Sequence, residues 1–388
     1  METERGTCLG SATSPASAPA RLSRRQLLAR AGAAAVAGVA GPALLARRLD
    51  VPRAVAATPR RCVALGPAGC IQPGCPQDLR AADNRTLLAQ SGTRWVRLWA
   101  DWPTLMPAPG TFAPDRVAAL DEQIALARAD GLRTILTLYR FPPWVNGVAQ
   151  AASFLPPADL SAGGAWGQFV SWTVSRYGPS IDVLELCNEP NLQWTARRLA
   201  PETVAAMFAT AQRIAGDLGS RVVLGGPGVS DVRGYDEFTD RLLDALARRR
   251  FVAGERFAWT HHNYGDVAYA TKRAAAVRRR LAGRWAGWPD GDAGEPQLLI
   301  TEGGVTLRTV ARRFGIADPA AQRVKQADLL RASWERLATT PEGDGVALVT
   351  QYLFHTDPRY DSGLCETAES GGARRPAFDA WRSLPSVA

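Results

Sequence analysis

Short apolar stretches alternate with longer amphipathic stretches from Arg61 to the end of the chain. The apolar stretches are rich in β-branched residues and have no polar face, which is typical of strands covered on both sides. The amphipathic stretches repeat apolar positions at helical spacing, and several end at a glycine. The predicted strands are Cys62–Leu65, Trp95–Trp99, Thr134–Tyr139, Ile181–Leu186, Val222–Leu224, Phe257–Thr260, Gln297–Thr301 and Val346–Phe354. The predicted helices are Asp78–Ser91, Pro114–Ala129, Gly164–Tyr177, Pro201–Leu218, Tyr235–Arg250, Tyr269–Trp285, Ala320–Ala338 and a last helix that starts with Pro376–Trp381.

Eight strand–helix units in this order predict an α/β protein, a single (β/α)8 TIM barrel with generous loops after its strands. The alternative is a doubly wound open sheet, which would place a glycine-rich phosphate-binding turn after the first strand. The segment found there, Gly66–Cys70, lacks the GxGxxG spacing. No shift in composition marks a domain boundary further along, so residues 57–388 are predicted to form one catalytic domain.

The first 56 residues are predicted to lie outside this domain. Ser23–Leu28 reads SRRQLL and looks like a twin-arginine export signal, and the apolar stretch Ala31–Ala46 and the small residues Ala54–Ala56 follow it. We therefore expect residues 1–56 to be a twin-arginine signal peptide of a secreted protein; a disordered Ala/Arg-rich tail is the alternative. The apolar stretch is shorter than ~18 residues and contains glycines, so we expect no stable membrane anchor.

Removing the leader changes the charge of the protein. The chain has a formal net charge of +9, but eight of its 46 basic residues and three of its 37 acidic residues lie in the leader. The remaining 38 basic and 34 acidic residues give a net charge of +4. This small excess is not typical of nucleic-acid binding, so we expect no nucleic-acid partner. Separately, we expect a monomer.

Five cysteines follow the leader, and an exported protein can form disulfides. We predict that Cys187, which lies inside a strand, is a buried free thiol. Any disulfide is predicted to use Cys62, Cys70, Cys75 and Cys365, with Cys70–Cys75 the easiest local pair and the pairing otherwise open. Neither the cysteines nor the three histidines have the spacing of a zinc motif, so we expect no metal and no cofactor.

Two of the predicted strands end in a carboxylate. The stretch Val183–Trp194 reads VLELCNEPNLQW, and Pro190 must end its strand because proline cannot donate to a sheet. The stretch Leu298–Gly304 reads LLITEGG, in which Glu302 ends the strand. In a (β/α)8 barrel these strand ends meet at the face that carries the active site. Glu189 and Glu302 are therefore expected to form a pair of carboxylates there.

With Asn188-Glu189-Pro190 after the fourth strand and Glu302 at the end of the seventh, the chain resembles the clan A glycoside hydrolases, which are retaining (β/α)8 enzymes. The resemblance covers nearly all of the chain after the leader. Gly363-Leu364 and Arg375-Pro376-Ala377 look like the endings of cellulase-like and family 39-like members. The resemblance implies that Glu189 is the acid/base, that Glu302 is the nucleophile and that Asn188 binds the sugar 2-hydroxyl.

Three further positions match the clan. Arg97 on the second strand resembles the arginine that keeps the nucleophile ionised, and His262 and Tyr264 resemble a pair that touches substrate and nucleophile. Many clan members also carry a histidine after the third strand and a tryptophan at the end of the eighth. This chain has Tyr139-Arg140 and Phe354-His355 at those places, which leaves the sugar and the linkage open.

The chemistry explains why such residues are needed. Cleavage of a glycosidic bond requires a neutral carboxylic acid that protonates the leaving oxygen and an ionised carboxylate at the anomeric carbon. A cation such as Arg97 would keep Glu302 ionised, and that negative charge is expected to raise the pKa of Glu189. Because Asn188 and Glu189 would point to opposite faces of a regular strand, we also expect a kink or bulge there.

Aromatic residues cluster after the strand ends, and sugar rings pack their C–H faces on aromatic rings. We expect about half of these residues to be exposed in a substrate cleft. The candidates are Trp99, Trp102, Phe141, Trp144, Trp194, Tyr264 and Phe354.

Together these features predict a secreted retaining glycoside hydrolase that cleaves a β-linked oligo- or polysaccharide by double displacement. The alternative is a non-catalytic carbohydrate-binding barrel, although such a protein usually lacks one of the two glutamates. A metal-dependent barrel hydrolase would need a His/Asp ligand set that the sequence does not show.

Overall fold

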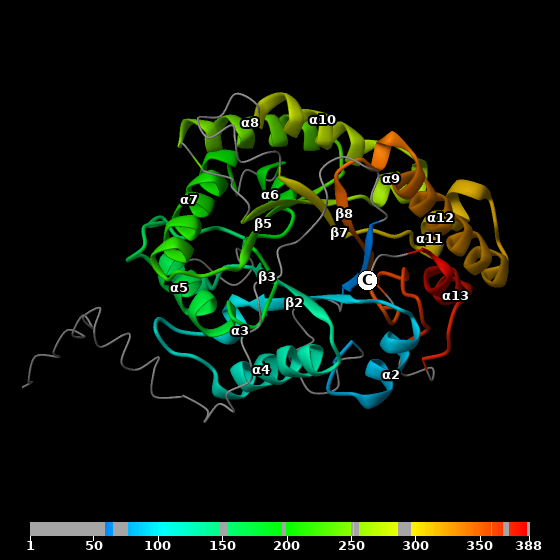
Figure 1. The fold of residues 1–388 in the computed structure, drawn as a ribbon, viewed down its shortest axis with the longest axis horizontal. Coiled ribbons are helices and arrows are strands. Elements are labelled where there is room, and N and C mark those ends of the chain that lie inside the picture. The colour runs from blue at the N-terminus through cyan, green and yellow to red at the C-terminus, as the bar shows by residue number, and fades with distance from the viewer. Residues whose placement is uncertain are drawn as a thin grey trace, which may run out of the picture. The chain divides into compact units, whose positions relative to one another are not determined.

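The computed structural model describes residues 59–64, 77–147, 154–195, 199–249, 251, 256–285, 296–357, 359–367 and 372–385. Within them, eight parallel strands close into a barrel in chain order, and β8 pairs with β1 (Figure 1). The predicted single (β/α)8 barrel is therefore confirmed. The predicted signal peptide, residues 1–56, lies outside the described residues.

The strands are short, and their bounds lie close to the predicted ones. They are β1 (Arg60–Ala64), β2 (Trp95–Asp101), β3 (Arg133–Tyr139), β4 (Val183–Glu185), β5 (Val223–Ser230), β6 (Phe257–His262), β7 (Gln297–Glu302) and β8 (Val346–Tyr352). The largest difference is β5, which continues through Gly225 and Gly226 to Ser230, because a glycine pair in a buried strand does not have to end it.

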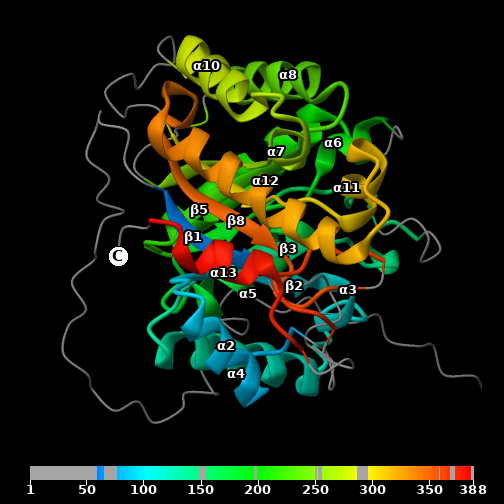
Figure 2. The same ribbon diagram turned by 90° about the vertical axis from the view of Figure 1, so that its right-hand side faces the viewer.

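In the described ranges, eight helices cover the outside of the barrel. They are α2 (Ala82–Gln90), α4 (Pro114–Ala129), α5 (Ala165–Tyr177), α7 (Pro201–Asp217), α8 (Tyr235–Arg248), α10 (Arg273–Trp285), α12 (Pro319–Thr339) and α13 (Pro376–Ser383). Figure 2 shows α12 and α13 side by side over β8 and β1, where the rings of Trp334 and Trp381 meet at 5.8 Å between centroids. Among the described residues, no helix is both long and apolar enough to cross a bilayer.

Shorter helical segments follow several strands and shape the carboxyl end of the barrel. They are α3 (Trp102–Leu105), η1 (Pro143–Val145), α6 (Pro190–Thr195), α9 (Tyr264–Tyr269) and α11 (Leu307–Phe314), and η4 (Pro341–Gly343) precedes β8. The predicted helix Tyr269–Trp285 begins only at Arg273, as α10, and Tyr269 is the last residue of α9, so a break separates the two helices. Asp266 explains the break, because its carboxylate accepts hydrogen bonds from Thr271 Oγ1 and from the backbone N–H groups of Arg273 and Ala274 at the start of α10.

The interior of the barrel is apolar toward the amino ends of the strands, where every strand contributes. Its members are Cys62, Trp95, Ile135, Val183, Val223, Ala258, Leu299, Ala347 and Leu348. Two residues further along, the inward positions become polar: Arg97 follows Trp95, and Glu185 follows Val183. Because strand side chains alternate between faces, this change with a period of two places polar groups at the carboxyl end of the barrel.

The cysteine predictions are partly confirmed. Cys187 is buried and free, as predicted. Cys62 and Cys365, two of the four cysteines predicted to be available for any disulfide, are buried and free as well, so neither forms one. Cys62 lies in the apolar barrel interior and Cys365 in the core between strands and helices, so each sulfur is surrounded by its own apolar cluster. Cys70 and Cys75 lie outside the described residues.

Candidate active site

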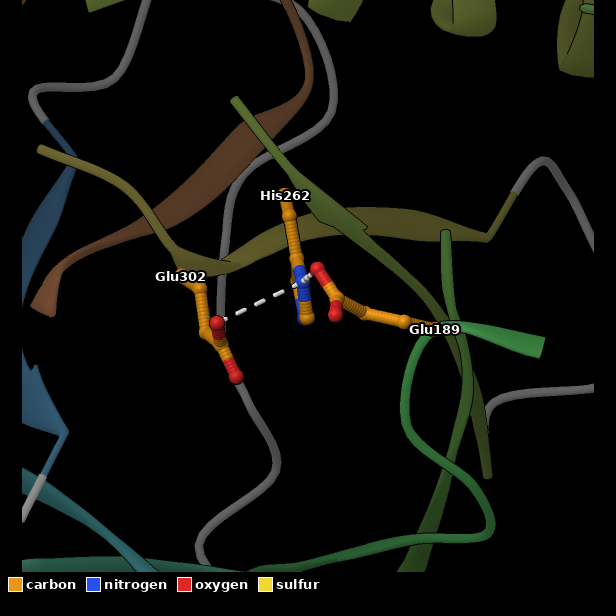
Figure 3. A group of neighbouring side chains, drawn as sticks. All are labelled: Glu189, His262 and Glu302. Carbon is orange, nitrogen blue, oxygen red and sulfur yellow. Dashed lines mark hydrogen bonds and ion pairs between the residues drawn. The ribbon is translucent and has the colours of Figure 1, made fainter. Parts of the chain in front are cut away.

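The two predicted glutamates meet at the carboxyl end of the barrel. Glu302 is the last residue of β7, and Glu189 immediately precedes α6. One oxygen of Glu189 and one of Glu302 lie within 4.8 Å of each other and of a nitrogen of His262. Figure 3 shows the two carboxylates pointing toward each other, with the His262 ring beside both. The structure therefore brings together residues from three different strand ends.

The backbone turns sharply at Glu189, as the sequence predicts. Glu189 has a φ of 48°, in the left-handed region that residues with a side chain rarely adopt. Its N–H donates a 2.9 Å hydrogen bond to the carbonyl oxygen of Gly228 on β5. Asn188 then points to the same site, where its Oδ1 accepts a 2.8 Å hydrogen bond from Arg97 Nη2. The strain at this turn brings two adjacent side chains to one site.

Arg97 is fully buried and bridges two carboxylates. Its Nη1 donates to Glu302 Oε1 at 2.6 Å, and its Nε and Nη2 donate to Glu185 Oε2 at 2.8 and 2.5 Å. Burial opposes the charge of the guanidinium, but Glu185 and Glu302 outweigh it, so the pKa of Arg97 is raised. A buried cation of this kind requires such partners, since an unpaired buried charge is strongly destabilising.

Glu185 is a central residue that sequence reasoning missed. It is fully buried, and besides Arg97 it accepts 2.7 Å hydrogen bonds from Thr137 Oγ1 and Thr301 Oγ1. Burial alone would raise the pKa of Glu185, but the charge of Arg97 and these hydrogen bonds hold it below its usual value. A single carboxylate two residues after the inward Val183 in an apolar strand was the signal that could have found it.

Three tyrosines line the side of Glu302 away from Arg97. Tyr264 donates a 2.6 Å hydrogen bond to Glu302 Oε2, so both oxygens of Glu302 accept from a strong donor. The ring of Tyr264 makes edge contacts with those of Tyr352 and Tyr360, at 6.1 and 5.7 Å between centroids. Tyr352 and Tyr360 meet at 5.2 Å. Neither was predicted, because Tyr352 reads as an ordinary strand residue and Tyr360 lies in a loop.

His262 contacts both glutamates. Its Nδ1 lies 3.0 Å from Glu189 Oε1 and 3.6 Å from Glu302 Oε2. Burial opposes a charged imidazole, but the two carboxylates outweigh burial and raise the pKa of His262. Burial likewise tends to raise the pKa of Glu189, but His262 outweighs it and lowers that pKa. The expectation of a raised pKa for Glu189 is therefore wrong for the free protein, because the sequence did not show an imidazole at this distance.

The same three side chains are the group, among the described residues, whose ligand atoms are close enough to hold a metal ion. Two features oppose that use. Arg97 brings a positive charge to within 2.6 Å of Glu302, and the raised pKa of His262 means that a proton competes for Nδ1. The arrangement therefore fits acid–base chemistry of the side chains better than cation binding.

Most of the predicted aromatic platforms are core residues. Trp102 is 1% exposed and stacks on Phe169 of α5 with centroids 4.5 Å apart. Phe354 is also 1% exposed, because β8 ends at Tyr352 and the left-handed backbone of Leu353, with a φ of 68°, changes the direction of the chain. Neither ring has a free face for a sugar, so these two predictions are corrected.

The remaining predicted aromatic residues lie in different surroundings from one another. Trp99 is buried, with its ring 4.2 Å from the guanidinium carbon of Arg97 and 4.9 Å from the Tyr139 ring, so it packs against these two side chains. Trp144 is half-buried, and its Nε1 donates to the carbonyl of Met106. Phe141 is buried in the core. The side chain of Trp194 lies outside the described residues. Tyr264 alone of the predicted set contacts a glutamate of the site in the described part of the chain.

The fold and site define a (β/α)8 barrel with paired carboxylates, and solved structures share that fold. A family 39 glycoside hydrolase from Bacteroides cellulosilyticus matches with a TM-score of 0.57 at 15% identity, over 86% of this chain and 64% of its own. A GH5_18 protein from Bifidobacterium longum subsp. infantis matches with a TM-score of 0.58 at 15% identity, over 85% and 81%. A GH5-4 broad-specificity endoglucanase from Clostridium acetobutylicum matches with a TM-score of 0.56 at 15% identity, over 83% and 95%.

These similarities concern the fold. The chain spans less than two thirds of the length of the family 39 protein. No family model matches the chain, and no curated protein matches it in sequence. The expected resemblance to cellulase-like and family 39-like barrels is thus confirmed as a shared architecture, and the chemistry must be argued from the residues of this chain.

Proposed function

We propose that this protein is a retaining glycoside hydrolase that cleaves a β-linked glycan by double displacement, with Glu302 as nucleophile and Glu189 as acid/base. The observation that carries the proposal is the pair of carboxylates of Glu189, between β4 and α6, and Glu302, at the end of β7, with oxygens within 4.8 Å of each other. Retaining enzymes place the two carboxyl groups about 5–5.5 Å apart, whereas inverting enzymes need about 6.5–9.5 Å to fit a water. The short separation favours retention.

The surroundings of each glutamate match its proposed role. Arg97 and Tyr264 donate to the two oxygens of Glu302, which favours the ionised form that attacks the anomeric carbon. In that step the new C–O bond to Glu302 forms while the bond to the leaving oxygen breaks, and Glu189 gives its proton to that oxygen. Water then attacks the glycosyl-enzyme, Glu189 takes a proton from it, and Glu302 is released.

The proton for the first step is held between two residues. In the free protein the raised pKa of His262 favours a protonated imidazole, and the lowered pKa of Glu189 favours an ionised carboxylate. The two groups are 3.0 Å apart. The pair titrates as a unit, so its single proton can move to Glu189 as the leaving oxygen approaches. In this proposal, His262 holds the proton that Glu189 later donates. It also contacts both carboxylates.

Substitution of each glutamate tests this assignment. Glu302→Ala should lose about three or more orders of magnitude in kcat on every substrate, because no nucleophile remains. Glu189→Ala should lose about 10²–10⁴-fold on poor leaving groups and much less on activated aryl glycosides, which need no proton. Azide should restore part of the turnover of Glu189→Ala and yield a β-glycosyl azide. Glu335→Ala, an exposed residue of α12, is the matched control and should keep the parent rate.

Proton NMR of the first-formed sugar decides the stereochemistry. A β-anomer is expected from a β-linked substrate. An inverted first product would contradict the proposal, and so would near-normal turnover by Glu302→Ala. Activity that disappears with a chelator and returns with a divalent metal would instead favour a metal-dependent reaction at Glu189, His262 and Glu302.

A further inference from the structure

A second group of side chains, on α9, α11 and α12, takes no part in the site described above. Arg313, near the end of α11, has its guanidinium carbon 5.0 Å from the centroid of the Tyr269 ring and 4.7 Å from that of the Phe314 ring. Lys325 of α12 places its Nζ 4.7 Å from the same Phe314 ring. We call Tyr269, Arg313, Phe314 and Lys325 the cationic platform.

The platform is exposed, although its rings are apolar. Tyr269 is 45% exposed and Phe314 36%, which places them among the few large apolar side chains exposed in the described part of the protein. Its base is rigid, because α9 and α11 share a small buried cluster that includes Val267 and Val310. An exposed aromatic surface on a packed base is typical of a binding site.

In the part of the chain that the structure describes, the positive charges of this surface contact aromatic rings but no carboxylate. Within the described residues, no carboxylate forms an ion pair with Arg313, Lys325 or the neighbouring exposed Arg308 and Arg312. Arg140, which follows β3, is different, since its Nε and Nη2 donate to the two carboxylate oxygens of Asp101 at 2.8 and 2.6 Å. The platform thus presents unneutralised positive charge.

The geometry of Arg313 suits a carboxylate. A guanidinium that packs on aromatic rings keeps its N–H donors at its edge, and its planar fork binds a carboxylate through two parallel hydrogen bonds. The two rings restrict the motion of Arg313, so little conformational entropy is lost on binding. The surface therefore fits a carboxylate better than a neutral hydroxyl.

The two short helices that carry most of the platform, α9 and α11, follow the strands β6 and β7, which carry His262 and Glu302. Helix α9 begins at Tyr264, which donates to Glu302, and Tyr269 is five residues further along, or about 8 Å at the rise of an α-helix. Helix α11 begins at Leu307, five residues after Glu302. A glycan that occupies the mouth at Glu302 could therefore extend to the platform.

We propose that the cationic platform is a subsite for a carboxylate-bearing sugar unit, so that the substrate is an acidic β-linked polysaccharide. This inference rests on the proposed glycan-cleaving function, which supplies the occupant. Arg313 receives the carboxylate, Lys325 adds a second positive charge, and the exposed ring edges of Tyr269 and Phe314 contact the C–H groups of the sugar.

Binding without hydrolysis tests the platform. The full chain carrying Glu302→Gln is run in gels that contain glucuronoxylan or carboxymethyl cellulose, and in gels with the neutral arabinoxylan or hydroxyethyl cellulose. The acidic polymers should retard the protein, and salt should weaken this effect because the contact is ionic. Arg313→Gln and Phe314→Leu should each weaken binding of the acidic polymers roughly fivefold.

The control is Arg249→Gln, which removes an exposed arginine at the far end of α8. It should bind as the parent does, and thermal unfolding should show that all variants are folded. Equal retardation by the neutral polymers, equal retardation by DNA, or unchanged binding in both platform variants would overturn the inference. The gel measurement needs no turnover. An inverted first product in the NMR experiment would therefore reject the proposed function, while binding at the platform would still be judged from the gels.

Discussion

At the scale of single residues, the contact between His262 and Glu189 determines the pH dependence expected of the proposed mechanism. His262 lies 3.0 Å from Glu189 Oε1, and its pKa is raised above the ordinary value of about 6.5 because the two carboxylates outweigh its burial. Acid catalysis ends when the pair loses this proton. The alkaline limb of kcat/KM is therefore expected above pH ~6.5.

Replacing His262 should move that limb. In His262→Gln the proton must reside on Glu189, which has lost the interaction that lowers its pKa but remains a carboxyl group with a lower intrinsic value than an imidazole. The alkaline limb should therefore shift to lower pH, while activated aryl glycosides lose less activity than poor leaving groups. A pH–rate profile measured on both substrate types checks this. An alkaline limb at its parental position would show that His262 does not hold the proton.

At the scale of an element, β5 determines the position of Glu189, which follows β4. Gly228, with a φ of 62°, accepts from the N–H of Glu189 and donates to Thr260 Oγ1. A Cβ added at Gly228 would lie 3.0 Å from the carbonyl oxygen of Cys187, 3.3 Å from Glu185 Oε1 and 3.5 Å from His262 Nε2. The register of β5 against β6 shifts between Pro227 and Val229, which marks a bulge at Gly228. The left-handed backbone and the close neighbours at this bulge therefore favour glycine beside the site.

Gly228→Ala should impair activity more than stability. We expect a loss of about 1 kcal/mol in the free energy of unfolding from the left-handed backbone and roughly 10²-fold in kcat/KM from displaced carboxylates. Gly131→Ala is the matched control, since Gly131 has a φ of 71° and its added Cβ would meet nothing within 4 Å. It should lose similar stability and retain activity. Denaturant unfolding and kinetics on both variants check this, and equal kinetic losses would contradict the role of Gly228.

At the scale of the whole molecule, the two histidines of β6 affect stability in opposite directions. His262 faces the mouth, whereas His261 faces the outer layer, 6.0 Å from the ring of Tyr235 on α8. Burial, together with the charges of His262 and Arg273, lowers the pKa of His261 to about 3. The unfolded chain binds a proton at this histidine below pH ~6.5, and the folded chain does not until about pH 3. His261 therefore destabilises the protein progressively as the pH falls through this window.

His261→Phe should flatten that dependence. Across the window, the titration of His261 reduces the free energy of unfolding by about 1.4 kcal/mol for each pH unit of acidification, and the variant lacks this contribution. His262 has the opposite sign: its raised pKa stabilises the fold below pH ~6.5, and this stabilisation is lost as the pH rises through the folded pKa. Urea unfolding of parent and variant between pH 4 and pH 7 measures the difference. Parallel curves would contradict the burial of His261 as a neutral group.

The sequence by itself determined the order of strands and helices and the positions of the two glutamates. Those features depend on local patterns: the period of two in a strand, the helical repeat, and a proline or glycine that ends an element. The kink at Asn188 and Glu189 followed from the same alternation, because adjacent side chains of a strand cannot reach one site without it. Cys187 was predictable as a buried thiol because it follows a run of strand residues.

The resemblance placed Arg97, His262 and Tyr264 near Glu302, but only the tertiary structure decided their distances and the further groups, such as Glu185, that complete the site. Glu185 and Arg97 are 88 residues apart in sequence and meet only because the barrel closes. The position of His262 beside Glu189 depends on the stagger of three strands, so the pKa of Glu189 was predicted with the wrong sign. Burial of Trp102 depends on α5, which packs Phe169 against it, and no local pattern distinguishes such a ring from one that faces a cleft. The succession of strands and helices follows from interactions between residues close in sequence. Burial and charge pairing at the site depend instead on residues that only the closed barrel brings together.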